Sequence, residues 1–466
     1  FINMDPKEPG TLLDLAVQTL MNNEPLAIHA LEEIPRELFI PLFIAAVSGG
    51  HKKILKAIVS MWPFHCLHVG TLNVQESYCE IVEALIDGLQ FLPVHNSSRV
   101  PKLRILDLRQ DTECKTTCSD FLNRFPLCFQ SCVYSPNSIL KLQGARPGFS
   151  NSESELQLSR QPMEVLVDLY LDGTVKTWQL LSVVLGKVEQ SFGSLHLCCR
   201  DLQIDKVSEC RSTLKFLDLV CIDHLGVHGS YLSEVCSILA QMIHLDSLSL
   251  SKITFRSYKG KSFRAFLTHL GRMDSLQELS LAYFSVKDQL HKILRVLSPE
   301  LDFLYLNVCD LTTKDFTSLS QSFQTSRLRV LNLSNNQITW EDSQPLRILL
   351  EKLSGTLKHL EINSCLITDT ILSSLIPAIR SCSLLHVLGF ASNPITMPML
   401  RNIFPHITAL KDLKYVLYPI PVHCYDQWGF RGSLDRQKLS VVKSQLKVML
   451  QAAERNDMKW TTSYDD

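Results

Sequence analysis

The chain has 466 residues and a formal net charge of −1, with 46 Lys and Arg against 47 Asp and Glu. Hydrophobic residues make up 45% and charged residues 20%, a globular composition that excludes disorder over the whole length. The balanced charge also argues against direct nucleic-acid binding, which needs a surplus of Lys and Arg to neutralise phosphates.

The N-terminal part shows no sign of export or membrane insertion. The first residues lack the basic segment and apolar core of a secretory signal. The longest apolar run, 38–47, has ten residues and contains Pro41, whereas a membrane-spanning helix needs roughly 20. Fifteen cysteines lie mostly in hydrophobic runs, so we expect free thiols in a reducing compartment and no membrane partner.

Residues 1–100 are predicted to form a helical cap on the open edge of a repeat stack. Segments 11–31, 36–47 and 52–61 carry apolar residues at helical spacing. Pro35 and a Gly-Gly pair separate these segments, as expected between short helices.

Two short patterns in this cap are typical of ubiquitin-ligase adaptors. The first fits an elongin-binding box, in which a leucine enters an apolar pocket on elongin C, with Thr11, Leu12, Ala16 and Leu20. The second begins 14 residues after Leu20 and matches the box that selects cullin-2, with Ile34, Pro35, Leu38 and Leu42. Amphipathic helices often satisfy either pattern, so cap helices packed on the repeats are the alternative. The order and spacing of the two patterns favour an adaptor.

The region 101–420 is predicted to be a leucine-rich-repeat solenoid of the α/β class. The pattern L-x-x-L-x-L-x-x-N/C-x-L starts at 276, 301, 328, 357 and 385, which gives periods of 25, 27, 29 and 28 residues. Weaker copies start at Leu103, Phe192, Leu214 and Leu245. Each L-x-L is a strand with its leucines in the core, the Asn or Cys turns the chain, and a helix returns.

The concave face of such a solenoid is its natural binding surface. The middle residue of each L-x-L points toward it, which gives the row Asp218, Ser249, Ser280, Tyr305, Asn332, Glu361 and Gly389. This row is small, polar and nearly neutral. We therefore expect it to hold a protein substrate, whose identity the sequence does not indicate.

The repeat pattern is interrupted near 112–161, where Ser, Gly and Pro residues indicate a mobile insertion. Two C-x₃-C pairs in it could hold zinc, with free thiols as the alternative: Cys114, Cys118, Cys128 and Cys132. The commoner zinc knuckle is C-x₂-C, so we predict no metal and no other cofactor. Cys198 and Cys199 lie on a repeat strand, where one should face the core and the other the surface.

Motifs for catalysis are absent from the sequence. G-x-x-x-x-G-K-[ST], G-x-G-x-x-G, H-E-x-x-H and G-x-S-x-G do not occur, so we predict that the protein is not an enzyme. LRILL (346–350) matches the L-x-x-L-L motif of nuclear-receptor ligands, but the same leucines suit the core of a repeat helix.

The C-terminal part, 421–466, is predicted to be a capping helix and a tail. Residues 413–421 have the pattern of the last repeat strand, and 436–454 that of the capping helix. The last dozen residues are expected to be frayed.

Several stretches together resemble the PRAME family (preferentially expressed antigen in melanoma), with its PRAME-like and oogenesin-type members. These stretches are ALEEIPRELFIPLFIAAVSGGH, LKAIVSMWPFHCLHVG, LRILDLR, MEVLVDLYL and LKYVLYPIPV. The resemblance runs from about residue 11 to 450. It implies a horseshoe of ribonuclease-inhibitor-like repeats.

The resemblance also implies a non-catalytic substrate-recognition subunit of a cullin-2 RING ubiquitin ligase, which promotes proteasomal degradation. Its partners would be elongin B/C, cullin-2 and the RING subunit, reached through the two boxes named above. One departure matters: the elongin box prefers Cys where this chain has Ala16, which keeps the small volume but loses a sulfur contact.

Two other functions remain open. A transcriptional corepressor scaffold of the retinoic-acid-receptor type would inhibit differentiation and apoptosis without any ligase, and the family is linked to this role. An inhibitor of a cytosolic enzyme would use the concave face and leave both boxes idle. We expect the protein in the cytoplasm and the nucleus.

Overall fold

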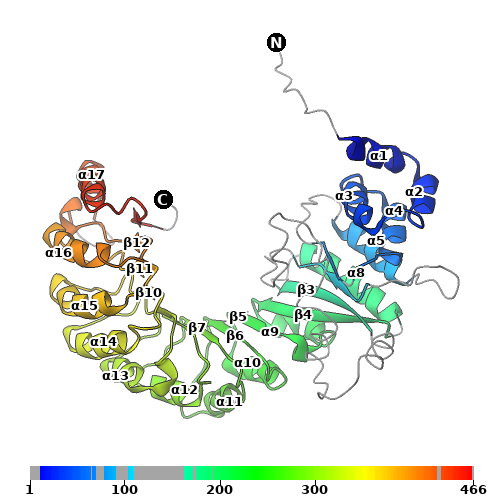
Figure 1. The fold of residues 1–466 in the computed structure, drawn as a ribbon. Helices are drawn as coiled ribbons and strands as arrows, with labels where there is room; N and C mark the ends of the chain where they lie inside the picture. The colour runs from blue at the N-terminus through cyan, green and yellow to red at the C-terminus, as the bar shows by residue number, and fades with distance from the viewer. Residues whose placement is uncertain are drawn as a thin grey trace. The chain divides into compact units, whose positions relative to one another are not determined.

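The computed structural model describes residues 11–64, 66–69, 78–90, 103–109, 162–171, 175–191, 193–427 and 432–463. They belong to two compact units (Figure 1). The first comprises Phe1–Leu202 with Ser212–Cys221, and the second comprises Gln203–Arg211 with Ile222–Asp466. The expected insertion and its cysteines Cys114, Cys118, Cys128 and Cys132 lie outside the described residues.

The first unit begins with two short helices where the sequence predicted one over 11–31. Asn23 separates the two helices and caps the second one. Its side-chain oxygen accepts a hydrogen bond from the Leu26 N–H at 3.2 Å. Pro25 then occupies the first turn of that helix, where its missing N–H is not needed. The helices are α1 (Leu12–Met21), α2 (Glu24–Ala30), η1 (Arg36–Leu38), α3 (Phe39–Ser48), α4 (Lys52–Ser60), α5 (Tyr78–Gln90) and α8 (Val175–Gln190).

A parallel sheet completes the first unit. Its strands are β1 (Cys66–His68), β2 (Ile105–Asp107), β3 (Met163–Leu171) and β4 (Leu195–Ile204). β1 pairs with β2 and β2 with β3, so the sheet starts inside the segment 1–100 that was expected to be helical. Cys198 and Cys199 are both buried, because both sides of β4 are covered here; the expected surface position of one of them is wrong.

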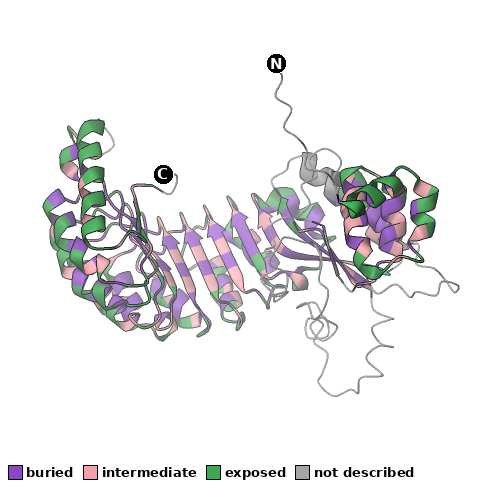
Figure 2. Cartoon of the chain, turned by 45° about the horizontal axis from the view of Figure 1, so that its top comes forward, coloured by how far each residue is buried: buried purple, intermediate pink, exposed green. Residues whose placement is uncertain are grey.

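The second unit confirms the predicted α/β leucine-rich-repeat architecture. Its strands pair in parallel in chain order and line the inner side of the curve, with the helices outside (Figure 1). Along these strands buried residues alternate with less buried ones (Figure 2). The strands are β5 (His224–His228), β6 (Ser247–Ser251), β7 (Glu278–Ala282), β8 (Phe303–Asn307), β9 (Val330–Asn332), β10 (His359–Glu361), β11 (Val387–Gly389), β12 (Tyr415–Leu417) and β13 (Lys459–Thr461).

Helices follow the strands in turn. They are α10 (Leu232–Leu239), α11 (Lys261–Leu270), α12 (Leu290–Val296), α13 (Thr313–Gln321), α14 (Trp340–Lys352), α15 (Asp369–Ser381), α16 (Met397–Thr408) and α17 (Arg436–Ala452). The remaining helical segments are α9 (Val207–Leu214), η2 (Leu219–Cys221), η3 (Phe323–Thr325) and η4 (Val422–Cys424). Among the described residues, no helix combines the length and the apolarity needed to cross a bilayer.

Buried Asn and Cys residues stabilise the turns after the strands. The Asn393 amide donates to the carbonyls of Ile362 and Phe390, at 2.9 and 2.7 Å. Its oxygen accepts from the N–H groups of Cys365 and Ile367, at 2.9 and 3.0 Å. One side chain thus satisfies backbone groups of two neighbouring repeats, which is the role that the pattern predicts for this position.

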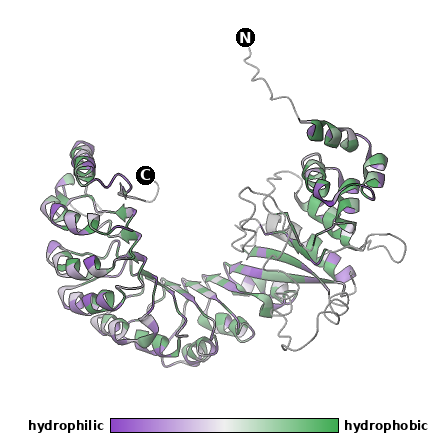
Figure 3. Cartoon of the chain, viewed as in Figure 1, coloured by the Kyte–Doolittle hydropathy of each residue, from purple (hydrophilic) through white to green (hydrophobic). Residues whose placement is uncertain are grey.

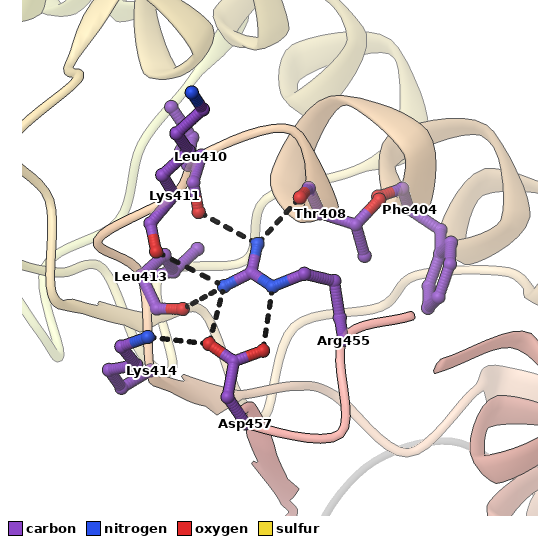
Figure 4. Close-up of polar contacts among 8 residues, drawn as sticks. All are labelled: Phe404, Thr408, Leu410, Lys411, Leu413, Lys414, Arg455 and Asp457. Carbon is purple, nitrogen blue, oxygen red and sulfur yellow. Dashed lines mark hydrogen bonds and ion pairs between the residues drawn. The ribbon is translucent and has the colours of Figure 1, made fainter. Parts of the chain in front are cut away.

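Part of the C-terminal tail that was expected to be frayed, Lys459–Thr461, forms the last strand instead. β13 pairs in parallel with β12. Arg455 supports this pairing, because its guanidinium binds the Asp457 carboxylate at 2.9 Å (Figure 4). It also donates to four backbone carbonyls, those of Thr408, Leu410, Lys411 and Leu413, at 2.6, 2.8, 3.5 and 2.7 Å. Trp460 packs on Phe404 and Tyr418, with ring centroids 5.4 and 5.7 Å apart.

Candidate interaction surfaces

Helix α1 starts at a capping box. The Thr11 hydroxyl accepts from the Asp14 N–H at 3.2 Å, and the Asp14 carboxylate accepts from the Thr11 N–H at 2.8 Å. These hydrogen bonds with the Thr11 hydroxyl and backbone hold the pKa of Asp14 below its usual range. Thr11 therefore fixes where the helix begins and makes Leu12 its first residue.

The two sides of α1 differ in burial. Val17 and Met21 are buried and anchor the helix to the first unit. Most of the helix is hydrophobic, as Figure 3 shows. We call its outward side the α1 face, made of Leu12, Leu15, Ala16 and Leu20. Leu12 is 86% exposed and Leu15 is 55% exposed, while Leu20 is half-buried. The predicted elongin-box residues thus share one accessible side, at i, i+4 and i+8.

The predicted cullin box is accessible only in part. Pro35 is exposed, and Ile34 and Leu38 are half-buried beside it. Leu42 is 3% exposed and belongs to the core, because the apolar run of α3 buries more than one side of the helix. A direct contact of Leu42 with a partner is therefore not compatible with this structure.

In the second unit, the strand register aligns the residues that follow the second leucine of each repeat, or the valine that replaces it. The row contains Gly226, Ser249, Ser280, Tyr305, Asn332, Glu361, Gly389 and Leu417. Six of the seven residues predicted for this inner surface are in it. Burial together with the carboxylates of Glu278 and Glu361 raises the pKa of Tyr305, so its hydroxyl stays a hydrogen-bond donor.

Asp218 is the exception, and its placement on the inner surface is wrong. It precedes η2, and its carboxylate lies 3.3 Å from Nε2 of His196 in the first unit. The strand of this repeat is β5, where Leu225 and Val227 are buried on either side of Gly226. This repeat begins at Ile222 and has Ile222 and Val227 where other repeats have leucine. Its start lies 23 residues before Leu245, a spacing that identifies the repeat better than the leucines after Leu214 do.

A second row on the same face was not predicted from the sequence. We call it the inner apolar row: Phe303, Val330, Val387 and Tyr415, with the polar His359 between the two valines. Most of its members are half-buried, and Tyr415 is 55% exposed. Each of these residues directly precedes the second leucine of its repeat, or the valine that replaces it. The row could therefore have been predicted by taking the residue before that leucine as well as the residue after it. The inner surface can therefore bury apolar groups next to its polar row.

The segment LRILL does not add a docking motif. Leu346, Leu349 and Leu350 on α14 are fully buried. This confirms that the leucines belong to the core of a repeat helix, and a groove-binding role would need them outside.

Two family models match this chain over most of its length. The PRAME C-terminal domain covers residues 163–463, and the PRAME N-terminal domain covers residues 9–114. The chain belongs to the PRAME family. The human PRAME family member 12 is 32% identical over 91% of this chain and 87% of its own. The human PRAME family member 20 is 30% identical over 96% of this chain and 93% of its own.

The solved structures give a looser match. The crystal structure of the Rad7 and Elc1 complex in yeast covers 93% of this chain and 100% of that chain, with 13% identity and a TM-score of 0.41. These values are too low to carry an argument about function. Within this PRAME-family chain the α1 face lies in the N-terminal match, and both inner rows lie in the C-terminal match.

Proposed function

We propose that this PRAME-family protein is the substrate-binding subunit of a cullin-2 RING ubiquitin ligase. The α1 face binds elongin C, and Ile34, Pro35 and Leu38 contact cullin-2. The polar row and the inner apolar row of the second unit hold a protein substrate, which is then marked for proteasomal degradation.

The exposure of Leu12 is the observation that carries this proposal. A helix that only capped the repeats would turn its leucines inward, yet α1 buries Val17 and Met21 and leaves Leu12 outside. The capping box holds the helix at this position, so the exposure is not caused by a frayed end. Covering one leucine contributes roughly 1.5–3 kcal/mol, enough for an anchor in an apolar pocket.

The protein itself would form no covalent bond. Its contribution is effective concentration: a substrate held on the inner surface keeps its lysines near the charged ubiquitin carrier. Phe303 and Tyr415 supply apolar contact area, while Ser280 and Glu361 supply hydrogen-bonding groups beside them. Such a surface suits an extended or helical protein segment with one apolar side.

Co-expression with elongin B and elongin C, followed by size-exclusion chromatography, tests the proposal. We expect the wild type to elute as a stoichiometric complex and Leu12→Asp to elute alone, because a carboxylate cannot enter an apolar pocket without a large desolvation penalty. Leu384→Asp is the matched control, since Leu384 is also exposed but lies in the second unit.

The control should bind like the wild type, and all three proteins should melt at similar temperatures. A folded wild type that elutes alone would contradict the adaptor function. The corepressor scaffold would then be the better explanation, because it needs the inner surface and no α1 face. Under that alternative Leu12→Asp leaves repression of a reporter gene unchanged.

A further inference from the structure

Four side chains of the first unit converge in a cluster to which no role has yet been given. His196 and Cys198 come from β4, Asp218 precedes η2, and Cys221 ends η2. The ligand atoms of His196, Asp218 and Cys221 all lie within 4.8 Å of one another. Cys198 follows His196 by two residues on β4 and lies next to Cys221, so its thiol can complete the set.

Local structure explains why these residues meet. His196 and Cys198 are alternate residues of a strand, so their side chains leave β4 on the same side. The chain then turns tightly before η2, where the Cys221 N–H donates to the Asp218 carbonyl at 3.2 Å. One oxygen of the Asp218 carboxylate accepts from the Val220 N–H at 3.1 Å, and the other faces His196. This turn brings Asp218 and Cys221 to the same side of the chain.

A fifth residue orients the imidazole. The Glu164 carboxylate on β3 lies 2.7 Å from Nδ1 of His196. A carboxylate in this position fixes the tautomer in which Nε2 carries the lone pair, the arrangement that accompanies histidine ligands in metal sites.

We propose that this cluster is a zinc site with His196 Nε2, Cys198 Sγ, Cys221 Sγ and the Asp218 carboxylate as ligands. Glu164 acts as a positioning residue. The proposal is independent of the adaptor function, so failure of the elongin experiment would leave it untouched.

The donor set and the geometry both favour zinc. Two thiolates and an imidazole suit zinc, whereas calcium and magnesium prefer oxygen ligands. Zinc bonds of about 2.0–2.1 Å in a tetrahedron separate the nitrogen and oxygen ligands by about 3.3 Å. His196 Nε2 and the Asp218 carboxylate are 3.3 Å apart. Zinc would replace the thiol protons and bind the lone pair on Nε2. The Asp218 side chain is 47% exposed, which leaves a way in for the ion.

The charge around the cluster suits this exchange. Arg200 follows Cys198 by two residues on β4 and brings a positive charge near the thiols. With two thiolates and one carboxylate around a divalent ion, the centre carries one excess negative charge, which Arg200 offsets.

Cobalt binding tests the site in the reduced full-length protein. Co²⁺ bound tetrahedrally by thiolates gives charge-transfer and visible bands that zinc then abolishes. We expect one equivalent per chain from this cluster. To exclude the two C-x₃-C pairs, the titration is repeated with Cys114, Cys118, Cys128 and Cys132 all replaced by serine.

Three variants and one control sharpen the test. Cys221→Ser and Asp218→Asn should each weaken zinc binding at least tenfold, and Cys221→Ser should also reduce the thiolate band. Glu164→Gln should weaken zinc binding by about 10- to 100-fold while the thiolate band persists at saturation. Cys236→Ser removes a buried thiol from the second unit and should change neither quantity.

Asp218→Asn keeps the test valid if the cysteine variant fails to fold, because the Asp218 side chain is 47% exposed and the substitution is conservative. The proposal is overturned if the wild type gives no thiolate band, or if the band and the zinc affinity are the same in Cys221→Ser. A disulfide between Cys198 and Cys221 in protein purified with reductant would overturn it equally.

Discussion

Helices α1 and α14 carry leucines at similar helical spacings, and the fold uses them in opposite ways. On α14, Leu346, Leu349 and Leu350 are fully buried, because this helix packs between α13 and α15 in the stack of repeats. On α1, which contacts α2 and α3, Val17 and Met21 are buried and Leu12 is exposed. Whether an apolar stripe on a helix belongs to the core or to a docking surface therefore depends on the elements that pack against the helix. The stripe in the sequence does not distinguish the two.

The largest expected effect comes from exchanging a buried leucine of α14 for a charge. Leu349→Asp should lower the free energy of unfolding by about 4 kcal/mol or more, because the substitution leaves a cavity and a buried carboxylate. Urea unfolding followed by circular dichroism measures this change.

The neighbouring residue of α14 and the first residue of α1 are the controls. Ile348→Asp and Leu12→Asp place the same charge at exposed positions and should each change the free energy of unfolding by less than about 1 kcal/mol. If Leu349→Asp and Leu12→Asp lowered the free energy of unfolding equally, Leu12 would be part of the core like Leu349, and the two helices would not differ in the way proposed.

The sequence predicts the second unit well where the pattern uses leucines. From β7 to β11, each L-x-L, or its variant ending in Ile362 or Phe390, became a strand at the expected place, and β12 lies in the predicted segment 413–421. A repeat that buries side chains at the same positions must follow the same path. Prediction failed where other residues took over the same task. β5 buries Val227 instead of a second leucine, and β13 is held by Trp460 and by Arg455 from the preceding turn. Neither strand has the leucines that the search required.

The candidate surfaces were predictable to a similar degree. The helical spacing places Leu12 and Ala16 on one side of α1, but it cannot tell that this side is exposed or that Leu42 is buried, since both follow from packing. The zinc cluster was not foreseen, because its residues do not have the spacing of a known zinc motif and meet only through the turn before η2. Short motifs are readable in a sequence only when their ligands are close along the chain.

The second prediction concerns the turns that link the repeats. Asn393→Ala should lower the free energy of unfolding by about 3 kcal/mol, because it leaves buried backbone donors and acceptors of two repeats without partners. Asn402→Ala, at an exposed position on α16, is the control and should have little effect. If urea unfolding gives the same midpoint for both variants, the buried amide is not what holds neighbouring repeats together.

The third prediction concerns the C-terminal strand, which depends on one arginine. Arg455→Ala should increase amide hydrogen exchange in β13 by a factor that corresponds to about 1–3 kcal/mol, with smaller changes elsewhere. Arg436→Ala removes an exposed arginine at the start of α17 and should leave this exchange unchanged. Rapid exchange of β13 in the wild type would show instead that the strand is not held.

The same contact gives a pH dependence with a definite sign. Hydrogen bonds from Arg455 and Lys414 hold the pKa of Asp457 well below its usual range. A lowered pKa in the folded state stabilises the protein fully above about pH 4, and this contribution is lost as the pH falls further. In the wild type, the protection of β13 amides against hydrogen exchange should therefore decline in acid. In Asp457→Asn this protection should be low at every pH.

The smallest expected effect is at Ala16, and it rests on the proposed function. If Ala16 faces the same pocket as Leu12, then Ala16→Cys adds one small apolar group to the contact, worth roughly 0.5–0.8 kcal/mol, and should tighten elongin C binding about two- to fourfold. Ala16→Ser has nearly the same size and helix propensity but adds a hydroxyl that must be desolvated, so it should bind no better than the wild type. Isothermal titration calorimetry against the elongin B/C pair resolves such a difference. Equal affinities for Cys and Ser at this position would mean that elongin C does not reach Ala16, and the α1 face would then be limited to Leu12 and Leu15.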